Sequence, residues 1–249
     1  MVNICTLAIL LKRGLLRLYV LAYIIILISS SCYASQGINI ADSRVLNDPP
    51  EIEIKDDTVY YDGQITNESY SAILKIIGTN KITNISINSI GGDVENALKI
   101  AGYIKKNELN VTVRSVCASA CANYIFIAGK NKFIGADSYL LWHGSINGPV
   151  KELEISGDIS REEFFQLNEV KQLKIKETKF YKENEVSSKI AFCPQLRQDY
   201  RKKFPEKWFS YTPQDMEKFG IRKISFVTTP SQWLMSMRSK HVLFANYCN

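Results

Sequence analysis

The sequence predicts a layered α/β domain built on a parallel sheet, and the alternation of strand-like and helix-like segments together with the length of the chain carries this prediction. In the first half of the chain, short alternating or apolar runs typical of strands take turns with segments whose apolar residues recur at helical spacing. Strands joined by right-handed helical crossovers pair in parallel within one sheet. With 249 residues, of which 46% are hydrophobic, the chain is long enough to bury one sizeable core.

The elements follow one another in a regular order from residue 58 onward. The run ITNISIN at residues 82–88 alternates like a strand, whereas residues 93–107 carry an apolar stripe at helical spacing. Residues 120–128 are almost wholly apolar, as expected of a buried helix. We therefore expect strands at 58–65, 82–88, 111–116 and 138–142, and helices at 68–77, 93–107 and 120–128.

The carboxyl-terminal half is less regular. Residues 152–185 are charged and have helical character, so we interpret 151–190 as an inserted helical arm, either a solvated excursion or a lid or subunit contact. Residues 212–221 predict a short helix that Thr212 caps and Gly220 ends. No second domain is expected. The expected organisation is a targeting segment at 1–34, a flexible lead-in at 35–57 and a single domain at 58–249.

The first 34 residues have the pattern of a secretory signal. Three basic residues between positions 12 and 17 precede an apolar run at 18–28, and small residues follow up to Ala34. Two outcomes stay open: cleavage, either after Ala34 or as a lipoprotein before Cys32, and an uncleaved helix that anchors the chain. Both place the domain in a bacterial periplasm or cell envelope, with membrane contact only if the segment is uncleaved.

The charge of the chain gives no argument for nucleic-acid binding. Without residues 1–34, the 31 Lys and Arg fall to 28 against 25 Asp and Glu, so the net charge falls from +6 to +3. No run of cysteine and histidine has the spacing of zinc ligands, so no metal site is expected.

Four cysteines remain beyond the targeting segment: Cys117, Cys121, Cys193 and Cys248. An even number permits two disulfides in an exported protein. We expect a bond that involves at least one of Cys117 and Cys121, with the other two cysteines as partners. The alternative interpretation is a pair of small buried thiols.

Three features fall directly after predicted strands, at the sheet edge where such domains place ligands. Ser119 begins the buried helix beside oriented backbone N–H groups, which suits a nucleophile. His143 ends a strand and is the candidate base, because only one other histidine is present. The pair Gly91-Gly92 would let backbone N–H groups approach a substrate. Each feature alone is more typical of packing or of a tight turn, and only their convergence indicates a site.

Four motifs occur in a fixed order: NSIGGDV at 88–94, CASAC at 117–121, FIAG at 126–129 and LWH at 141–143. These motifs, together with residues 212–221, resemble the successive motifs of the ClpP-type serine peptidases, which belong to the ClpP/crotonase superfamily. The resemblance covers residues 58–224. The Cys-x-Ser-x-Cys form behind an export signal is most similar to exported bacterial ClpP-like proteins. The resemblance implies a ClpP/crotonase-like layered fold with repeated β-β-α units.

The resemblance also implies a mechanism. Ser119 would be the nucleophile, His143 the general base, and the N–H groups of Gly91 and Ala120 the oxyanion donors. The implied reaction is hydrolysis of a peptide or protein substrate through an acyl-enzyme, without metal or organic cofactor. The family forms rings, so a homo-oligomer is the expected assembly.

The chain departs from the family in three places. Cys121 stands where a small glycine is expected, and the FIAG motif lies one residue further from the serine. The third triad member fails to align, because counting back from Thr212 reaches Phe204. Asp199 and Glu206 are the nearest carboxylates, and we favour Asp199. Without an orienting carboxylate, the rate of such a triad falls by about 10⁴.

Two functional classes follow. One is an exported serine peptidase or more general acyl hydrolase. The other is a catalytically inactive ClpP-fold module that binds a partner or organises an envelope assembly, as the unaligned aspartate and the charged arm suggest. A crotonase-like acyl-thioester enzyme is disfavoured, because export removes the chain from coenzyme A.

Overall fold

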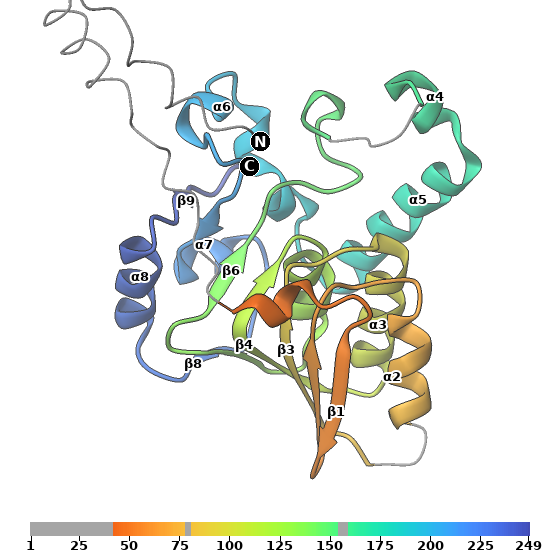
Figure 1. The fold of residues 1–249 in the computed structure, drawn as a ribbon. Helices are drawn as coiled ribbons and strands as arrows, with labels where there is room; N and C mark the ends of the chain where they lie inside the picture. The colour runs from red at the N-terminus through yellow and green to blue at the C-terminus, as the bar shows by residue number, and fades with distance from the viewer. Residues whose placement is uncertain (1–41, 78–80, 154–158) are drawn as a thin grey trace, which may run out of the picture. The chain divides into compact units, whose positions relative to one another are not determined.

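The computed structural model describes residues 42–77, 81–153 and 159–249 (Figure 1). The expected targeting segment at 1–34 lies outside these residues. Within them, no helix combines the length and the apolar character that crossing a membrane requires.

A mostly parallel sheet forms the centre of the domain. Within the described residues it has seven strands, in the order β1-β2-β3-β4-β5-β8 with β6 paired to β4. All pairings are parallel except that of β1 with β2. The predicted α/β fold is thus confirmed. The bounds are β1 Glu51–Lys55, β2 Thr58–Asp62, β3 Asn84–Ser89, β4 Asn110–Ala118, β5 Lys132–Ile134, β6 Tyr139–Leu141 and β8 Ile224–Phe226.

The long strand β4 brings two later segments to the same sheet. Residues 111–113 of β4 pair with β5, and residues 116–118 pair with β6. Between these two halves the register with β3 shifts. Since Ala118 pairs with Leu141, β4 and β6 end side by side. The segments that follow these two strands therefore begin at one edge of the sheet.

The domain begins earlier than the sequence predicts. Strand β1 lies within the lead-in expected at 35–57, yet it pairs along its whole length with β2. Before it, Val45 of the 3-10 helix η2 (Ser43–Leu46) is buried in the core. The alternating stretch EIEIK is the signal for this strand, and the two prolines directly before it favour a loop instead.

Helices α2 (Ser69–Ile77) and α3 (Val94–Lys106) lie side by side on one flank of the sheet (Figure 1). Helix α3 begins where the sequence predicts, because the Asp93 side chain caps it by accepting a hydrogen bond from Asn96 N at 2.7 Å. Its apolar stripe is buried against the sheet through residues such as Ile100 and Ile104.

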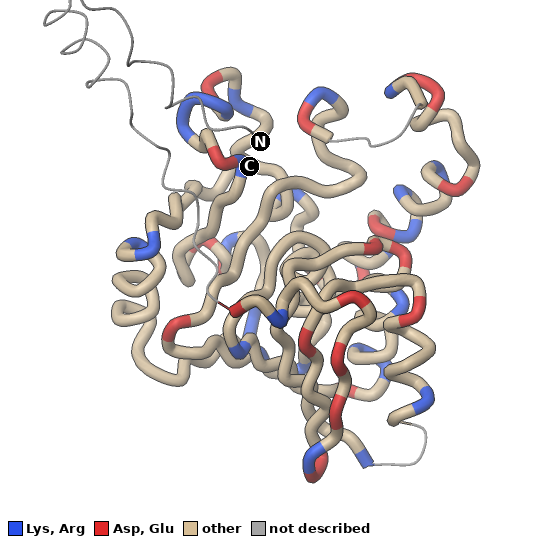
Figure 2. The backbone as a smooth tube through the Cα atoms, in the orientation of Figure 1, with Lys and Arg blue, Asp and Glu red and all other residues tan. Residues whose placement is uncertain are grey.

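Among the described residues of the expected arm at 151–190, two α-helices follow each other. Helix α4 (Arg161–Gln166) starts with a capping box, and α5 (Asn168–Glu183) follows it after a single residue. In Figure 1, α4 and the outer part of α5 project from the rest of the domain. Figure 2 shows charges of both signs along them. The last turns of α5 are buried in the domain through Glu177, Phe180 and Tyr181.

The carboxyl-terminal third contains elements that sequence patterns do not reveal. Helix α7 (Pro213–Lys218), capped by Thr212, matches the predicted short helix. Helix α8 (Pro230–Ser239) buries Trp233, whose Nε1 donates to Ser138 O at 3.0 Å. A chain of aromatic contacts joins the remaining pieces, through Tyr200, Phe204, Phe209, Tyr211, Phe219 and Tyr247. The other elements are α6 (Tyr200–Lys203), β7 (Ser210–Tyr211) and β9 (Phe244–Ala245), with β7 and β9 paired in parallel.

Two disulfides join the four cysteines of the domain. Cys117 bonds to Cys121, and Cys193 bonds to Cys248 near the carboxyl terminus. A bond that involves the cysteines of the serine motif is therefore present, as expected, but it joins these two cysteines to each other. The expected partners, Cys193 and Cys248, bond to each other instead. Disulfides of this kind are typical of proteins in oxidising compartments.

Candidate active site

The turn after β4 holds Ser119 in an unusual backbone conformation. Its φ is +55°, in the left-handed region that residues with side chains rarely adopt. Ser119 N donates to Leu141 O at 3.0 Å, and Ser119 O accepts from Asn123 N at 2.8 Å. Backbone strain of this kind persists only where surrounding contacts impose it, and it concentrates at functional sites.

The helix after Ser119 is a π-helix rather than the predicted α-helix. Element η3 covers Cys121–Phe126, and all of its residues are buried. The preceding residue, Ala120, has helical backbone angles. Wider turns of this type recur at functional sites, because they shift the residues that the helix presents.

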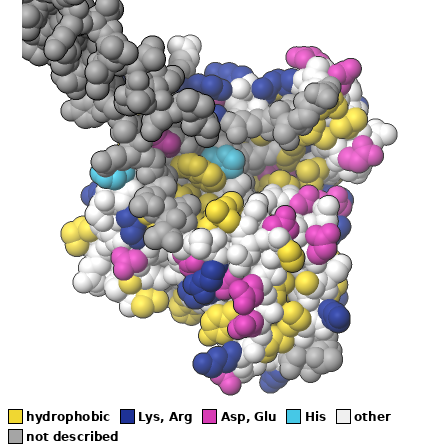
Figure 3. Space-filling view, viewed as in Figure 1, with side chains coloured by type: hydrophobic (Ala, Val, Ile, Leu, Met, Phe, Trp, Pro, Cys, Tyr) yellow, Lys and Arg dark blue, Asp and Glu magenta, His cyan; other side chains and the backbone are white. Residues whose placement is uncertain are grey.

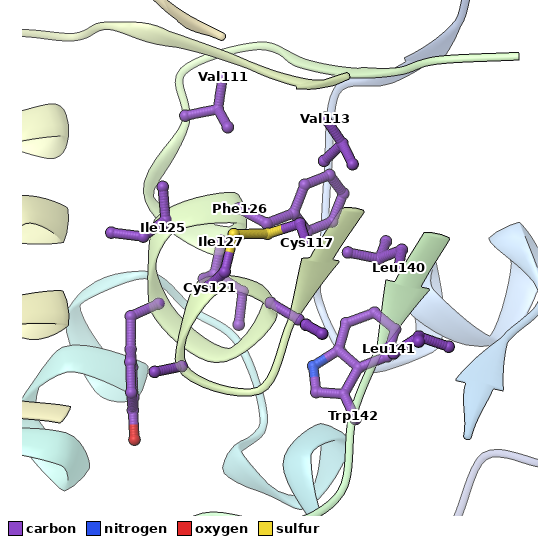
Figure 4. Close-up of a cluster of buried hydrophobic side chains, with 14 of the residues drawn as sticks. Val111, Val113, Cys117, Cys121, Ile125, Phe126, Ile127, Leu140, Leu141 and Trp142 are labelled. Atoms are coloured by element: carbon purple, nitrogen blue, oxygen red, sulfur yellow. A yellow bond between two sulfur atoms is a disulfide. The ribbon is translucent and has the colours of Figure 1, made fainter. Parts of the chain in front are cut away.

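The disulfide between Cys117 and Cys121 closes the turn on itself. It joins the end of β4 to the first residue of η3, four positions on, and encloses Ser119. Figure 4 shows the two sulfur atoms among core side chains that include Ile127 and Leu140. Both cysteines are fully buried. The bridge is therefore shielded from solvent and limits the conformations open to the turn.

Close contact with this turn requires glycine at position 91. Its φ is +94°, and a Cβ atom there would lie 2.6 Å from Ala118 O. The same atom would lie 2.8 Å from both Ala120 N and Ser119 Cβ. No side chain fits at these distances, so the Gly91 backbone lies directly against the serine turn.

The backbone N–H groups around Ser119 differ in their partners. Gly91 N donates to Ser89 Oγ at 3.1 Å. Among the described residues, the N–H groups of Gly92 and Ala120 donate to no protein acceptor. The predicted donor Gly91 is therefore engaged, and the next amide along the chain is open. Sequence spacing alone does not distinguish these two adjacent glycines.

His143 meets Ser119 at the sheet edge. Ser119 Oγ lies 2.6 Å from His143 Nε2, which is a hydrogen-bond distance. The pairing of Ala118 with Leu141 accounts for this distance, because both residues lie one or two positions beyond that pair. The structure thus brings together the two residues that the sequence selects as nucleophile and base.

Two amide side chains hold the loop that follows His143. Gln195 Nε2 donates to His143 O at 2.7 Å, and Asn123 Nδ2 donates to Gly144 O at 2.9 Å. Gln195 belongs to the 3-10 helix η6 (Cys193–Leu196), beside the second disulfide. Sequence analysis missed both amides. Neither stands in a motif, and Gln195 is 52 positions away from the residue it supports.

Asp199, the predicted third member, is paired with cations. Its carboxylate accepts from Arg197 Nε at 3.0 Å and lies 3.0 Å from Lys203 Nζ, and these partners lower its pKa to about 2. Within the described residues, no hydrogen bond joins Asp199 to His143. Phe204, where the family's aspartate would align, is buried among aromatic rings.

A cavity of about 220 Å³ opens beside Ser119 and His143. Figure 3 shows hydrophobic side chains next to a histidine on this face of the molecule. The volume is below the roughly 300–1,000 Å³ of pockets that enclose whole small molecules, so it suits a single side chain. Besides Ser119 and His143, the lining includes the apolar Val94, Tyr124, Ile146 and Leu153 and the charged Glu152 and Lys207.

A buried carboxylate from α5 holds Tyr124, one of the residues that line the cavity. Glu177 is fully buried and accepts a hydrogen bond from Tyr124 OH at 2.6 Å. It also accepts from Asn147 N at 3.0 Å and Asn147 Nδ2 at 2.7 Å. Burial raises the pKa of Glu177, although these hydrogen bonds oppose the shift. The arm is thereby joined both to η3 and to the loop after His143, a connection that the sequence does not indicate.

Comparison with known proteins adds little beyond this geometry. No family model matches the chain, and no curated protein matches it. Among solved structures, it is similar to a mutant of ClpP1 from Listeria monocytogenes, over 71% of this chain and 94% of that one. The sequence identity is 20% and the TM-score is 0.45. Such a similarity assigns no activity. Within the described residues, no group of His, Cys, Asp or Glu side chains is placed to hold a metal ion.

Proposed function

We propose that the chain is an exported serine hydrolase, most specifically a peptidase, in which Ser119 is the nucleophile and His143 the general base. The observation that carries the proposal is the distance of 2.6 Å between Ser119 Oγ and His143 Nε2 beside the cavity. A strained serine next to an imidazole nitrogen is the arrangement that nucleophilic catalysis needs.

The reaction would proceed through an acyl-enzyme. Ser119 Oγ attacks the carbonyl carbon of the scissile bond while His143 Nε2 takes the hydroxyl proton. When the tetrahedral intermediate collapses, the bond to the leaving amine breaks and His143 returns that proton to the amine. A water molecule then attacks the acyl group while His143 takes its proton. As the bond to Ser119 Oγ breaks, His143 returns this proton to Ser119 Oγ, which releases the carboxylic acid and restores the hydroxyl and the neutral imidazole.

The oxyanion of the intermediate needs hydrogen-bond donors beside Ser119. Ala120 N is one, as the family resemblance implies. For the second we propose the N–H of Gly92 in place of Gly91, because the N–H of Gly91 donates to Ser89 Oγ. A preorganised donor of this type contributes about 10²–10³ in rate.

A fluorophosphonate probe tests the proposal, because it reacts with activated serines. The mature protein should be labelled at Ser119, and both Ser119→Ala and His143→Ala should abolish labelling. Ser225→Ala and His241→Ala are matched controls, since both residues are exposed and away from the cavity. If the folded wild-type protein is not labelled by a broad panel of such probes, the proposal is wrong.

The compartment and the partners are part of the same proposal. The two disulfides support export into an oxidising compartment such as a periplasm. The substrate would be a peptide or protein, with one side chain of the acyl half seated in the cavity. We also propose a homo-oligomer, which sedimentation of the purified chain would test.

The alternative function is a catalytically inactive module for binding or assembly. Its support is the projecting arm, where Leu167 is 41% and Ile175 is 60% exposed. Under this alternative, Ser119→Ala keeps the cellular phenotype, whereas replacing Leu167 and Ile175 by Ser removes it. The reverse result favours the hydrolase.

A further inference from the structure

Trp208 lies opposite His143 across a short antiparallel backbone bridge. Trp142 and Phe209 form an antiparallel bridge in which Trp142 N donates to Phe209 O at 2.8 Å and Phe209 N to Trp142 O at 2.9 Å. Because the bridge is antiparallel, the next opposed pair is His143 and Trp208. A pair that follows a doubly hydrogen-bonded one has its side chains closest together.

The two rings are in contact. The centroids of His143 and Trp208 lie 4.3 Å apart, with the ring planes tilted by 42°. Trp208 is half-buried, so the indole packs against the imidazole and also remains partly exposed to solvent. Aromatic pairs at this separation attract each other beyond the apolar area that they bury.

The backbone of Trp208 is fixed on both sides. Phe209 is fully buried and contacts the rings of Phe204 and Tyr211. On the other side, Tyr200 OH donates to Lys207 O at 2.7 Å, and Lys207 has a φ of +62°. The indole is therefore placed by the core of the carboxyl-terminal segment and not by its own contacts alone.

We propose that Trp208 is a positioning residue for His143, an inference that rests on the proposed hydrolase function. The indole face limits rotation of the imidazole and keeps Nε2 directed at Ser119 Oγ. When His143 takes the serine proton, the imidazolium gains a further attraction to the indole face. Trp208 does not touch the reacting atoms, so its effect is on the rate of serine attack and not on substrate binding.

The test measures the rate and the affinity of fluorophosphonate labelling separately, from the dependence of rate on probe concentration. Trp208→Leu removes the ring and keeps an apolar side chain, and it should slow labelling by about tenfold with unchanged probe affinity. Trp208→Phe restores a ring and should label within about threefold of the wild-type protein. Tyr103→Leu, which removes a half-buried ring from α3, is the control and should label normally. Trp208→Met supplies a second ring-free variant if the leucine variant does not fold.

A spectroscopic measurement makes the result independent of activity. The chain has only two histidines, so the imidazole proton resonances of His143 are assigned by comparison with His143→Ala. The indole ring current should displace those resonances in the wild-type protein, and Trp208→Leu should remove the displacement.

The outcomes separate the two proposals. If the wild-type protein labels and the folded Trp208→Leu or Trp208→Met variant labels at the same rate, the positioning role is wrong and the hydrolase stands. Equal slowing in Trp208→Phe and Trp208→Leu also contradicts it, because a ring would then have no special effect. If the wild-type protein never labels, the hydrolase is wrong and the positioning role falls with it.

Discussion

The proposed nucleophile and the proposed base are held by two different kinds of structure. Ser119 lies in a five-residue stretch that closes on itself through the Cys117–Cys121 disulfide, directly after the carboxyl end of the internal strand β4. His143 depends on segments far along the chain, including Gln195 and the bridge to Phe209. The nucleophile is held by residues next to it in the sequence, whereas the base is held by residues that lie more than 50 positions away. The two sides should therefore respond differently to the same kind of damage.

The two disulfides provide the largest contrast. Removing Cys193–Cys248 by a double alanine substitution should lower the free energy of unfolding by about 4 kcal/mol, because this disulfide closes a loop of 55 positions. Removing Cys117–Cys121 in the same way should cost about 2 kcal/mol, since that loop spans four positions. Urea unfolding measures both values. Equal losses would contradict the loop-length argument.

Steric contact at the serine turn gives the next effect. Gly91→Ala should lower the free energy of unfolding by about 3 kcal/mol, because the added Cβ meets the backbone of Ala118 and Ala120 at a positive φ. The matched control is Gly102→Ala in the middle of α3, where a Cβ has nothing within 4 Å. That variant should be up to about 1 kcal/mol more stable. If Gly91→Ala lowered the free energy of unfolding by less than about 1 kcal/mol in the same urea series, the turn would be able to shift and accommodate the added Cβ.

The link between the arm and the cavity should appear in the pH dependence of stability. The pKa of Glu177 is raised in the folded protein from an ordinary 4.5, so its stabilising contribution is complete below pH 4.5 and is lost as pH rises through the folded-state value. Glu177→Gln removes this titration. The free energy of unfolding should thus fall less steeply above pH 4.5 in the variant than in the wild-type protein. Glu183→Gln, at the exposed end of α5, is the control. Parallel curves for all three proteins would contradict the raised pKa of Glu177.

The smallest expected effect is at the carboxylate that sequence reasoning favoured. Asp199→Asn should leave the fluorophosphonate labelling rate unchanged within about twofold, because the carboxylate serves an exposed pair of cations. A loss approaching the 10⁴ of a missing triad aspartate would restore Asp199 to the site. Glu206→Gln, at the other carboxylate near this position, provides the comparison.

Prediction from sequence succeeded where the signal was local. Most strands and helices from residue 58 to residue 142 follow from alternation and helical spacing, and Ser119 and His143 follow from their places after strands. The short strand β5 was missed, and the π-helical form of η3 was not predicted. Strand β1 was missed, although its EIEIK pattern is visible, because the prolines before it suggested a loop. The carboxyl-terminal elements were missed because their aromatic residues face one another across the fold and show no period along the chain.

By itself, the sequence determined the parallel α/β core, the glycine at position 91 and the serine that follows β4. These depend on the spacing of apolar residues and on side-chain size, which a linear pattern records. The tertiary structure alone decided which glycine N–H is open, which residues surround His143 and how Glu177 joins the arm to the cavity. The bond that engages Gly91 N is local, to Ser89 Oγ, but it depends on the folded shape of the turn. The contacts of His143 and Glu177 join segments that lie tens of positions apart, and burial and hydrogen bonding select them only after the chain has folded.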